Sequence, residues 1–330
     1  MKRNSILFLL AVTFALLSCG SKSNTANEDE TTDSTAVANV SEVYFIRDIN
    51  AENLVKIYEA LNRSAEGRVA VKISTGEPGG HHYLDPNLIK NLVQMVNGTI
   101  VECNTAYPGK RMNTADHLQA AKDHGFTAIA NVDIMDAEGE MQIPVEGGKH
   151  LQYDIVGNHL QNYDFMVVLS HFKGHAMGGF GGALKNISIG VASTAGKSWI
   201  HSAGTTVNPD EMWANLPEQD DFTESMAEAA KAVADHFGDK ILYISVLNNL
   251  SVDCDCDANP AEPKMADIGI MASLDPVALD QACVDMIFNS DDEGRADLIE
   301  RINSRKGTHI LDHAATIGVG SKTYKVIELK

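Results

Sequence analysis

The stretch from Ser170 to Ser202 combines histidines, lysines and glycines in a way that points to a binding site. It reads SHFKGHAMGGFGGALKNISIGVASTAGKSWIHS and follows an apolar run, DFMVVLS. Glycine has no Cβ, so its backbone amide can approach a ligand more closely than that of any other residue. We expect such contacts at Gly178, Gly179, Gly181 and Gly182.

The ionisable side chains of this stretch define the chemistry that such a site would perform. Its lysines offer cations for an anionic group, at Lys173, Lys185 and Lys197. Its histidines offer metal ligation or proton transfer near neutral pH, at His171, His175 and His201. The sequence GGALKN predicts a glycine-rich turn entering a helix, whose first amides favour anions. No GK[ST] follows the glycines at the spacing of a Walker A loop.

A second unusual segment, DCDCD at 253–257, follows the apolar run ILYISVLNN. Cys254 and Cys256 with the flanking carboxylates are suited to a soft or borderline divalent metal, although C-x-C is not a typical zinc spacing. A local disulfide and an acidic loop with incidental thiols are the alternatives, and the residues alone leave all three open. Cys283 lies in an apolar helical pattern and is predicted to be a buried small hydrophobe.

Short apolar runs alternate with helical patterns along the chain and predict an α/β fold. We expect a mixed or mostly parallel sheet layered with helices, in one compact unit or two closely packed lobes. The predicted strands are 43–46, 69–74, 99–103, 165–170, 241–247, 268–272 and 324–329. Ligands collect at the carboxyl ends of such strands, so the site is expected there. The polar loops at 75–82 and 104–111 follow predicted strands and are further candidates.

Helix boundaries can be read from capping residues. Asp85-Pro86 and Asp275-Pro276 each pair an N-cap with a proline at the first helical position. Asn113 is expected to open a helix that Gly125 closes, and Gly238 to end the helix ESMAEAAKAVADHF. Asp280 is expected to face solvent. Residues 136–162 predict a hairpin or irregular insertion, and residues 203–222 a long surface loop.

The beginning of the chain has the pattern of an export signal. Lys2 and Arg3 precede an apolar run too short to span a bilayer, and LLSC resembles the bacterial lipobox, in which Cys19 is acylated. An ordinary cleaved signal with a chance cysteine is the alternative. We therefore predict a lipoprotein signal peptide at 1–18, a lipidated Cys19 with a flexible tether at 19–42, and an α/β domain at 43–330. The expected location is the bacterial cell envelope, on the periplasmic side or the cell surface, with the lipid membrane as a partner.

The charge and the cysteine count exclude several classes of protein. Removal of Lys2 and Arg3 takes the formal charge from −19 to −21, which disfavours nucleic acid and anionic lipid faces as partners. Four cysteines remain after Cys19, too few for a disulfide scaffold in a chain of this length.

Several segments together resemble the domain-of-unknown-function 362 family. They are HFKGHAMGGFGGALKNISIG, CNTAY, CDC and DIGIMASLDPVALDQACVDMI, and the resemblance covers nearly all of residues 43–330. Many members of that family carry a bacterial ferredoxin insert. Residues 202–253 contain no cysteine, so no ferredoxin-type iron–sulfur cluster is expected here.

One segment is also similar to the nickel-pincer lactate racemases. It is HAMGGFGGALK, followed by a further histidine sixteen residues after the lysine. The resemblance implies that His175 is an acid/base for a hydroxy-acid carbon. It also implies that Lys185 holds the pincer cofactor and that His201 ligates nickel. A simple divalent metal acquired after export is the cofactor that we expect.

Two functions follow from these observations. The first is a membrane-anchored protein with a metal- or anion-binding site, acting on a small hydroxy or carboxylic acid. In it, His175 is the base, Lys185 stabilises negative charge, and the metal ligands are His171, His201, Cys254 and Cys256. The alternative is a non-catalytic lipoprotein that captures a metal or small ligand. An enzyme needs a proton-transfer group left free beside the binding groups, so the sequence leaves open whether this is one.

Overall fold

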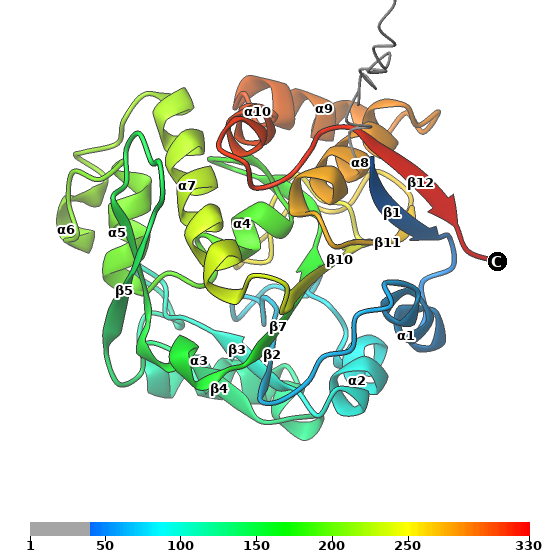
Figure 1. The fold of residues 1–330 in the computed structure, drawn as a ribbon, viewed down its shortest axis with the longest axis horizontal. Coiled ribbons are helices and arrows are strands. Elements are labelled where there is room, and N and C mark those ends of the chain that lie inside the picture. Colours follow the sequence, from blue (N-terminus) through cyan, green and yellow to red (C-terminus); the bar gives the residue numbers. More distant parts are fainter. Residues whose placement is uncertain (1–39) are drawn as a thin grey trace, which may run out of the picture. The chain divides into compact units, whose positions relative to one another are not determined.

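An eight-stranded sheet runs through residues 40–330, the part of the chain that this computed structural model describes (Figure 1). Its strands follow in the order β12 (Tyr324–Glu328), β1 (Ser41–Ile46), β11 (Gly269–Ser273), β10 (Ile241–Leu247), β7 (Phe165–His171), β2 (Val69–Lys72), β3 (Thr99–Glu102) and β4 (Val132–Ile134). β11 is antiparallel to both of its neighbours, and the other neighbouring pairs are parallel. The predicted α/β fold with a mostly parallel sheet is confirmed, as are all seven predicted strands.

Helices cover both faces of the sheet, so its central strands, such as β7 and β10, are buried on both sides. Along β7, Val168 belongs to one apolar cluster and its neighbours Val167 and Leu169 to the other. One face packs on α1 (Ala51–Ala60) and α2 (Pro86–Met95). The other packs on α4 (Ala183–Ile187), α7 (Gln219–Phe237), α8 (Pro276–Phe288) and α10 (His309–Thr316). Residues 40–330 form one compact unit, so the alternative of two lobes is not realised.

The predicted caps are present. The side chains of Asp85, Asn113 and Asp275 each accept a hydrogen bond from a backbone N–H in the first turn of α2, of α3 (Thr114–Asp123) and of α8. Gly125 and Gly238 follow α3 and α7 with φ of +89° and +58°, in the left-handed region that favours glycine.

The remaining elements are short. The insertion predicted at 136–162 contains an antiparallel hairpin of β5 (Glu140–Pro144) and β6 (Tyr153–Gly157), and a second hairpin joins β8 (Lys173–His175) to β9 (Gly179–Gly181). The others are η1 (Phe126–Ala128), η2 (Asn158–Asn162), α5 (Thr194–His201), α6 (Pro209–Met212) and α9 (Arg295–Ser304).

The prediction of an irregular loop at 203–222 was wrong in part, because this region contains α6 and the start of α7. Asn208 accepts a hydrogen bond from the backbone N–H of Asp210 and precedes a proline. It repeats the cap-and-proline device that opens α2 and α8.

The N-terminal predictions lie outside the described residues. These are the signal peptide at 1–18, acylation of Cys19 and all but the last residues of the tether at 19–42. The first strand, β1, begins at Ser41, close to the expected domain start at 43. Within residues 40–330, no helix has the length and apolar character needed to cross a membrane.

Candidate functional site

A pocket of about 440 Å³ opens at the carboxyl ends of β2, β3 and β7. The chain passes from β2 to β3 on one side and from β7 to β10 on the other, so the pocket lies at a topological switch point, where open α/β sheets bind ligands. His175, Lys185 and His201 all line it, as do Cys254 and Cys256. The side chains that the sequence singled out therefore converge on one cavity.

The glycine-rich segment shapes this pocket in two different ways. Gly181 and Gly182 line the cavity, whereas Gly178 and Gly179 do not. Gly179 has φ of +79°, and a Cβ there would lie 2.8 Å from the Cα of Gly307. Gly179 thus allows the β8–β9 turn to pack closely against its neighbours. The expected backbone contact with a ligand is limited to Gly181 and Gly182.

Asp280 holds the start of α4, the helix that carries Lys185. Its carboxylate oxygens accept hydrogen bonds from the backbone N–H of Ala183 at 2.7 Å and of Leu184 at 3.0 Å. The residue is fully buried, and burial raises the pKa of its carboxyl group to about 7. The expectation that Asp280 faces solvent was wrong because helical spacing alone does not reveal a partner nearly one hundred residues away.

Four basic side chains point to the charge of the ligand. Lys72, Arg111, Lys185 and Lys197 line the pocket. Arg111 is paired with Glu77 at 2.8 Å and Glu102 at 3.5 Å. Among residues 40–330, none of the three lysines has a carboxylate within salt-bridge distance. The Nζ atoms of Lys72 and Lys197 each donate to a backbone carbonyl at 2.5 Å, and that of Lys185 has no protein hydrogen-bond partner within this range.

Holding Lys72 and Lys185 charged in the pocket without a paired carboxylate lowers the stability of the folded protein. Burial lowers the pKa of Lys72 and of Lys185 to about 8, and the charges of the neighbouring basic side chains act in the same direction. The carboxylates of Glu102 and Asp255, which lie beyond salt-bridge distance of these two lysines, oppose the shift without cancelling it. Desolvated cations without counter-ions are rare in protein interiors unless a ligand pairs with them. This arrangement, within a chain of net charge −19, favours a small anion as the missing partner.

The ring of His175 presents an N–H to the pocket side of its hairpin. Its Nδ1 accepts a hydrogen bond from the backbone N–H of Gly178 at 2.9 Å. A backbone N–H can only donate, so the neutral ring must carry its hydrogen on Nε2. Burial and the charge of Lys185 hold the pKa of His175 well below its usual range, which keeps the ring neutral. In this arrangement His175 is a hydrogen-bond donor.

His201 has the opposite arrangement. Its Nδ1 lies 2.7 Å from the backbone carbonyl oxygen of Lys197, which can only accept, so Nδ1 carries the hydrogen and Nε2 keeps its lone pair. Burial lowers the pKa of His201 to about 4. A ring anchored through Nδ1 with a free Nε2 is suited to accept a proton or to ligate a metal.

His171 lines the pocket but has no nitrogen left for a metal. Its Nδ1 lies 2.9 Å from Asp255 Oδ2, and its Nε2 donates to the carbonyl oxygen of Asn248 at 2.8 Å. Although burial alone would raise the pKa of Asp255, the neighbouring His171 and Lys173 lower it, so the carboxylate is charged. The expected metal-ligand role of His171 is therefore not supported: the ring fixes the 254–256 loop instead.

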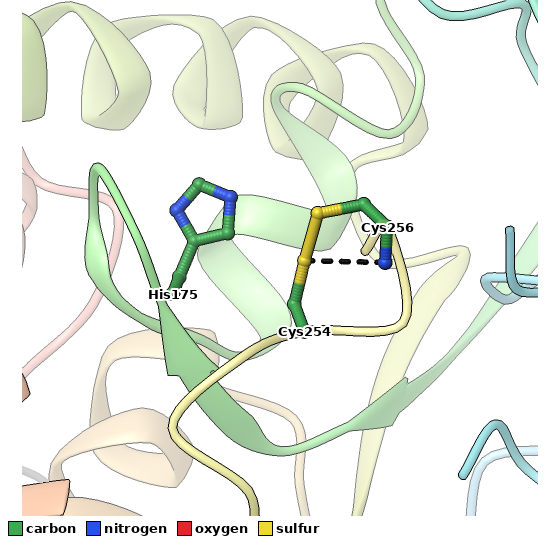
Figure 2. Close-up of side chains that lie close together, drawn as sticks. All are labelled: His175, Cys254 and Cys256. Carbon is green, nitrogen blue, oxygen red and sulfur yellow. Dashed lines mark hydrogen bonds between the residues drawn. A yellow bond between two sulfur atoms is a disulfide. The ribbon is translucent and has the colours of Figure 1, made fainter. Parts of the chain in front are cut away.

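Cys254 and Cys256 are joined by a disulfide (Figure 2), so of the three alternatives for this segment the structure adopts the local disulfide. In this state the two sulfurs are not thiolates, and the expected pair of cysteine metal ligands requires prior reduction. A disulfide that closes a loop of three residues restricts the unfolded chain by only about 1.6 kcal/mol, against about 4.7 for a loop of 100 residues. The Cys254–Cys256 disulfide, which lies beside the ring of His175, therefore contributes little to the stability of the whole protein.

Comparison with known proteins assigns the family. A family model described as "Domain of unknown function (DUF362)" matches residues 69–285, well over half of the chain. The chain belongs to the DUF362 family. No curated protein matches this DUF362 protein.

Two solved structures are similar to it at 16% sequence identity. The lactate racemase apoprotein from Thermoanaerobacterium thermosaccharolyticum has a TM-score of 0.38, with 62% of this chain and 50% of that chain covered. A protein from Thermotoga maritima has a TM-score of 0.39, with 71% and 57% covered. The DUF362 chain thus spans about half the length of each of these proteins.

Two pocket residues of this DUF362 protein were missed from the sequence. Lys72 ends β2 and Glu102 ends β3, and both are almost fully buried. Although burial alone raises the pKa of Glu102, His117 and Arg111 hold it well below its usual range. The signal was present: the runs VAVKIS and TIVEC each place one charge in a strand that is otherwise apolar, and central parallel strands are covered on both faces.

Proposed function

We propose that the pocket binds a small carboxylic or hydroxy acid and that the protein catalyses proton transfer on it. One observation carries the proposal: three lysines without carboxylate partners among residues 40–330 converge on a single cavity. A bound carboxylate would supply the missing negative charge. Hydrogen bonds between charged partners contribute about 1.5 to 3 kcal/mol each, enough for specific binding of a small ligand.

The two pocket histidines support an acid–base role in which the base is His201, predicted from the sequence as a metal ligand, and not His175, the predicted base. His201 Nε2, which keeps its lone pair, would take a proton from the carbon beside the carboxylate. The electron pair of the broken bond would stay on the substrate as an oxyanion. The neutral His175 would stabilise that oxyanion by donating a hydrogen bond from Nε2, and Lys185 would do so through its charge. Return of the proton from His201 completes the cycle.

The residues also fit a cofactor that brings its own metal ligands, as the resemblance to nickel-pincer racemases implies. Such a group needs one imidazole lone pair and a cation for its anionic part. His201 Nε2 would then be the protein ligand instead of the proton acceptor, because its one free lone pair cannot do both, and Lys185 would hold the anionic part. When bound, the group would supply a Lewis acid beside the hydroxy-acid carbon.

Two measurements test this proposal on protein purified from its native host. Calorimetric titration with lactate, malate, citrate and phosphate at fixed ionic strength should show binding that Lys185→Met weakens. Lys90→Met, at an exposed lysine outside the pocket, should leave the binding unchanged. Proton NMR in D2O should show exchange at the carbon beside the carboxylate, and His201→Ala should abolish it. Binding without exchange would favour the non-catalytic alternative, and absence of binding by any of these acids would refute the proposal.

A metal-capturing function is a second candidate, favoured by a separate observation. One ligand atom each from His175, Cys254 and Cys256 lies within 4.8 Å of the others. Reduction by a dithiol would turn the disulfide into two thiolates and complete a soft metal site. Titration with Co2+ should then give sulfur-to-metal charge-transfer absorption after reduction only. Identical spectra before and after reduction would exclude this function.

The location at the cell envelope is part of the same proposal. A lipid chain on Cys19 would hold residues 40–330 at a membrane surface. Metabolic labelling with a fatty acid should mark the wild-type protein and not Cys19→Ala. Equal labelling of both would refute acylation at this residue.

A further inference from the structure

A second cluster of histidines and carboxylates lies on α7 and α10, which pack against each other (Figure 1). Glu224 and Glu228 are one turn apart on α7, and His309 and His313 are one turn apart on α10. His309 Nε2 lies 3.0 Å from Glu224, and His313 Nε2 lies 3.1 Å from Glu228. None of these residues lines the pocket described above.

The pair of Glu228 and His313, called the inner pair here, fixes the loop between β5 and β6 onto α7 and α10. Glu228 is fully buried, and its carboxylate accepts hydrogen bonds from the backbone N–H groups of Lys149, His150 and Leu151 at 2.8 to 2.9 Å. A Cβ on Gly148 would lie 2.0 Å from the carbonyl oxygen of Leu151, so the loop can close over Glu228 only with glycine there. The inner pair is therefore a fully bonded structural anchor, and it holds His150 in place.

The outer group is centred on Glu224. Its carboxylate contacts two imidazole rings from separate elements, those of His150 and His309. Glu224 lies 2.7 Å from His150 Nε2 and 3.0 Å from His309 Nε2. Asp221, one turn earlier on α7, places Oδ1 at 3.6 Å from the same nitrogen of His150. Three of these ligand atoms, from His150, Asp221 and Glu224, lie within 4.8 Å of one another. Imidazole nitrogens with carboxylate oxygens form the usual donor set for zinc and related divalent ions.

We propose that His150, Asp221 and Glu224 form a zinc-type divalent metal site. His309 lies on the other carboxylate oxygen of Glu224 and would complete the site as the fourth ligand when a metal binds. The competing cation is Lys149, whose Nζ lies 2.7 Å from Glu224. Its side chain is 60% exposed, so it can swing into solvent when a metal binds. The metal would join three elements, α7, α10 and the β5–β6 loop, and would stabilise the folded protein by binding only to it.

The test uses the full chain with its disulfide intact, so that thiolates do not contribute. Zn2+ binding is measured by calorimetry, and the melting temperature is measured with and without Zn2+. The double variant His150→Ala/His309→Ala should bind one equivalent less and lose its Zn2+-dependent rise in melting temperature. The matched control is His159→Ala/His236→Ala, which removes two histidines that belong to none of the candidate metal-binding groups among residues 40–330 and should keep both properties.

A second variant keeps the test decisive if the double variant folds poorly. Glu224→Gln preserves the side-chain shape and should weaken Zn2+ binding at least tenfold while its circular dichroism stays that of the wild type. Unchanged stoichiometry and affinity in both variants would overturn the proposal. So would an equal loss in the His159→Ala/His236→Ala control.

Discussion

Replacement of Lys185 by methionine separates a functional lysine from a structural one. Burial and the nearby basic side chains lower its pKa from 10.5 to about 8. Each pKa unit corresponds to about 1.4 kcal/mol, so keeping this ammonium charged in the empty pocket costs up to about 3 kcal/mol, less where water enters. Lys185→Met removes that cost, and we expect the free energy of unfolding at pH 7 to rise by about 1 to 3 kcal/mol.

The same change should weaken binding of a small carboxylate about 10- to 100-fold, because one charged hydrogen bond of about 1.5 to 3 kcal/mol is lost. Calorimetric titration gives the affinity, and urea denaturation gives the stability. Lys173→Met is the matched comparison: this buried lysine is paired with Asp255 at 2.8 Å. Its loss should destabilise the protein by about 3 kcal/mol, since it leaves a buried carboxylate without that partner. A Lys185→Met protein that is destabilised and binds as tightly as the wild type would refute the reasoning.

Three further predictions concern pH, redox state and packing. The pKa values of Lys72 and Lys185 are about 8 in the empty pocket, so both lysines lose their charge as the pH rises above 8. The affinity for an anion, measured by calorimetry, should therefore fall by up to about tenfold per pH unit for each lysine. An affinity that stays constant from pH 7 to 10 would contradict this. Reduction of the Cys254–Cys256 bond should lower the free energy of unfolding by no more than about 2 kcal/mol in urea denaturation, because the loop is so short. Gly182→Ala places a Cβ 2.3 Å from Asp280 and should impair both folding and ligand affinity. In Gly181→Ala the new Cβ contacts only the flexible side chain of Lys185, at 3.3 Å, so the melting temperature should fall far less.

Much of the fold could be predicted because the responsible signals are local. Apolar runs of four to seven residues marked the central strands, and Asp85, Asn113 and Asp275 marked helix starts through contacts within three residues. β4 was missed because its three residues, VDI, are too few to show a pattern. α6 was missed because the cap at Asn208 was read as part of a loop.

The sequence could predict that the candidate residues meet at one edge of the sheet, where the structure has a pocket, but not which proton each histidine carries. Parallel strands bring their carboxyl ends to one edge, so His175, Lys185 and His201 could be expected to meet. The proton positions of His175 and His201 depend on a backbone N–H and a backbone carbonyl, which spacing does not reveal. Both ring nitrogens of His171, a predicted metal ligand, are instead hydrogen-bonded to Asn248 and Asp255, which lie more than seventy residues away in the sequence.

The most direct test of the central claim is an anomalous difference map from a crystal soaked in selenate, a small dianion. The account predicts a selenium peak inside the pocket, within hydrogen-bond distance of Lys185 Nζ and of at least one of Lys72 and Lys197. A well-ordered pocket without such a peak, in a crystal that binds selenate elsewhere on the protein, would contradict it.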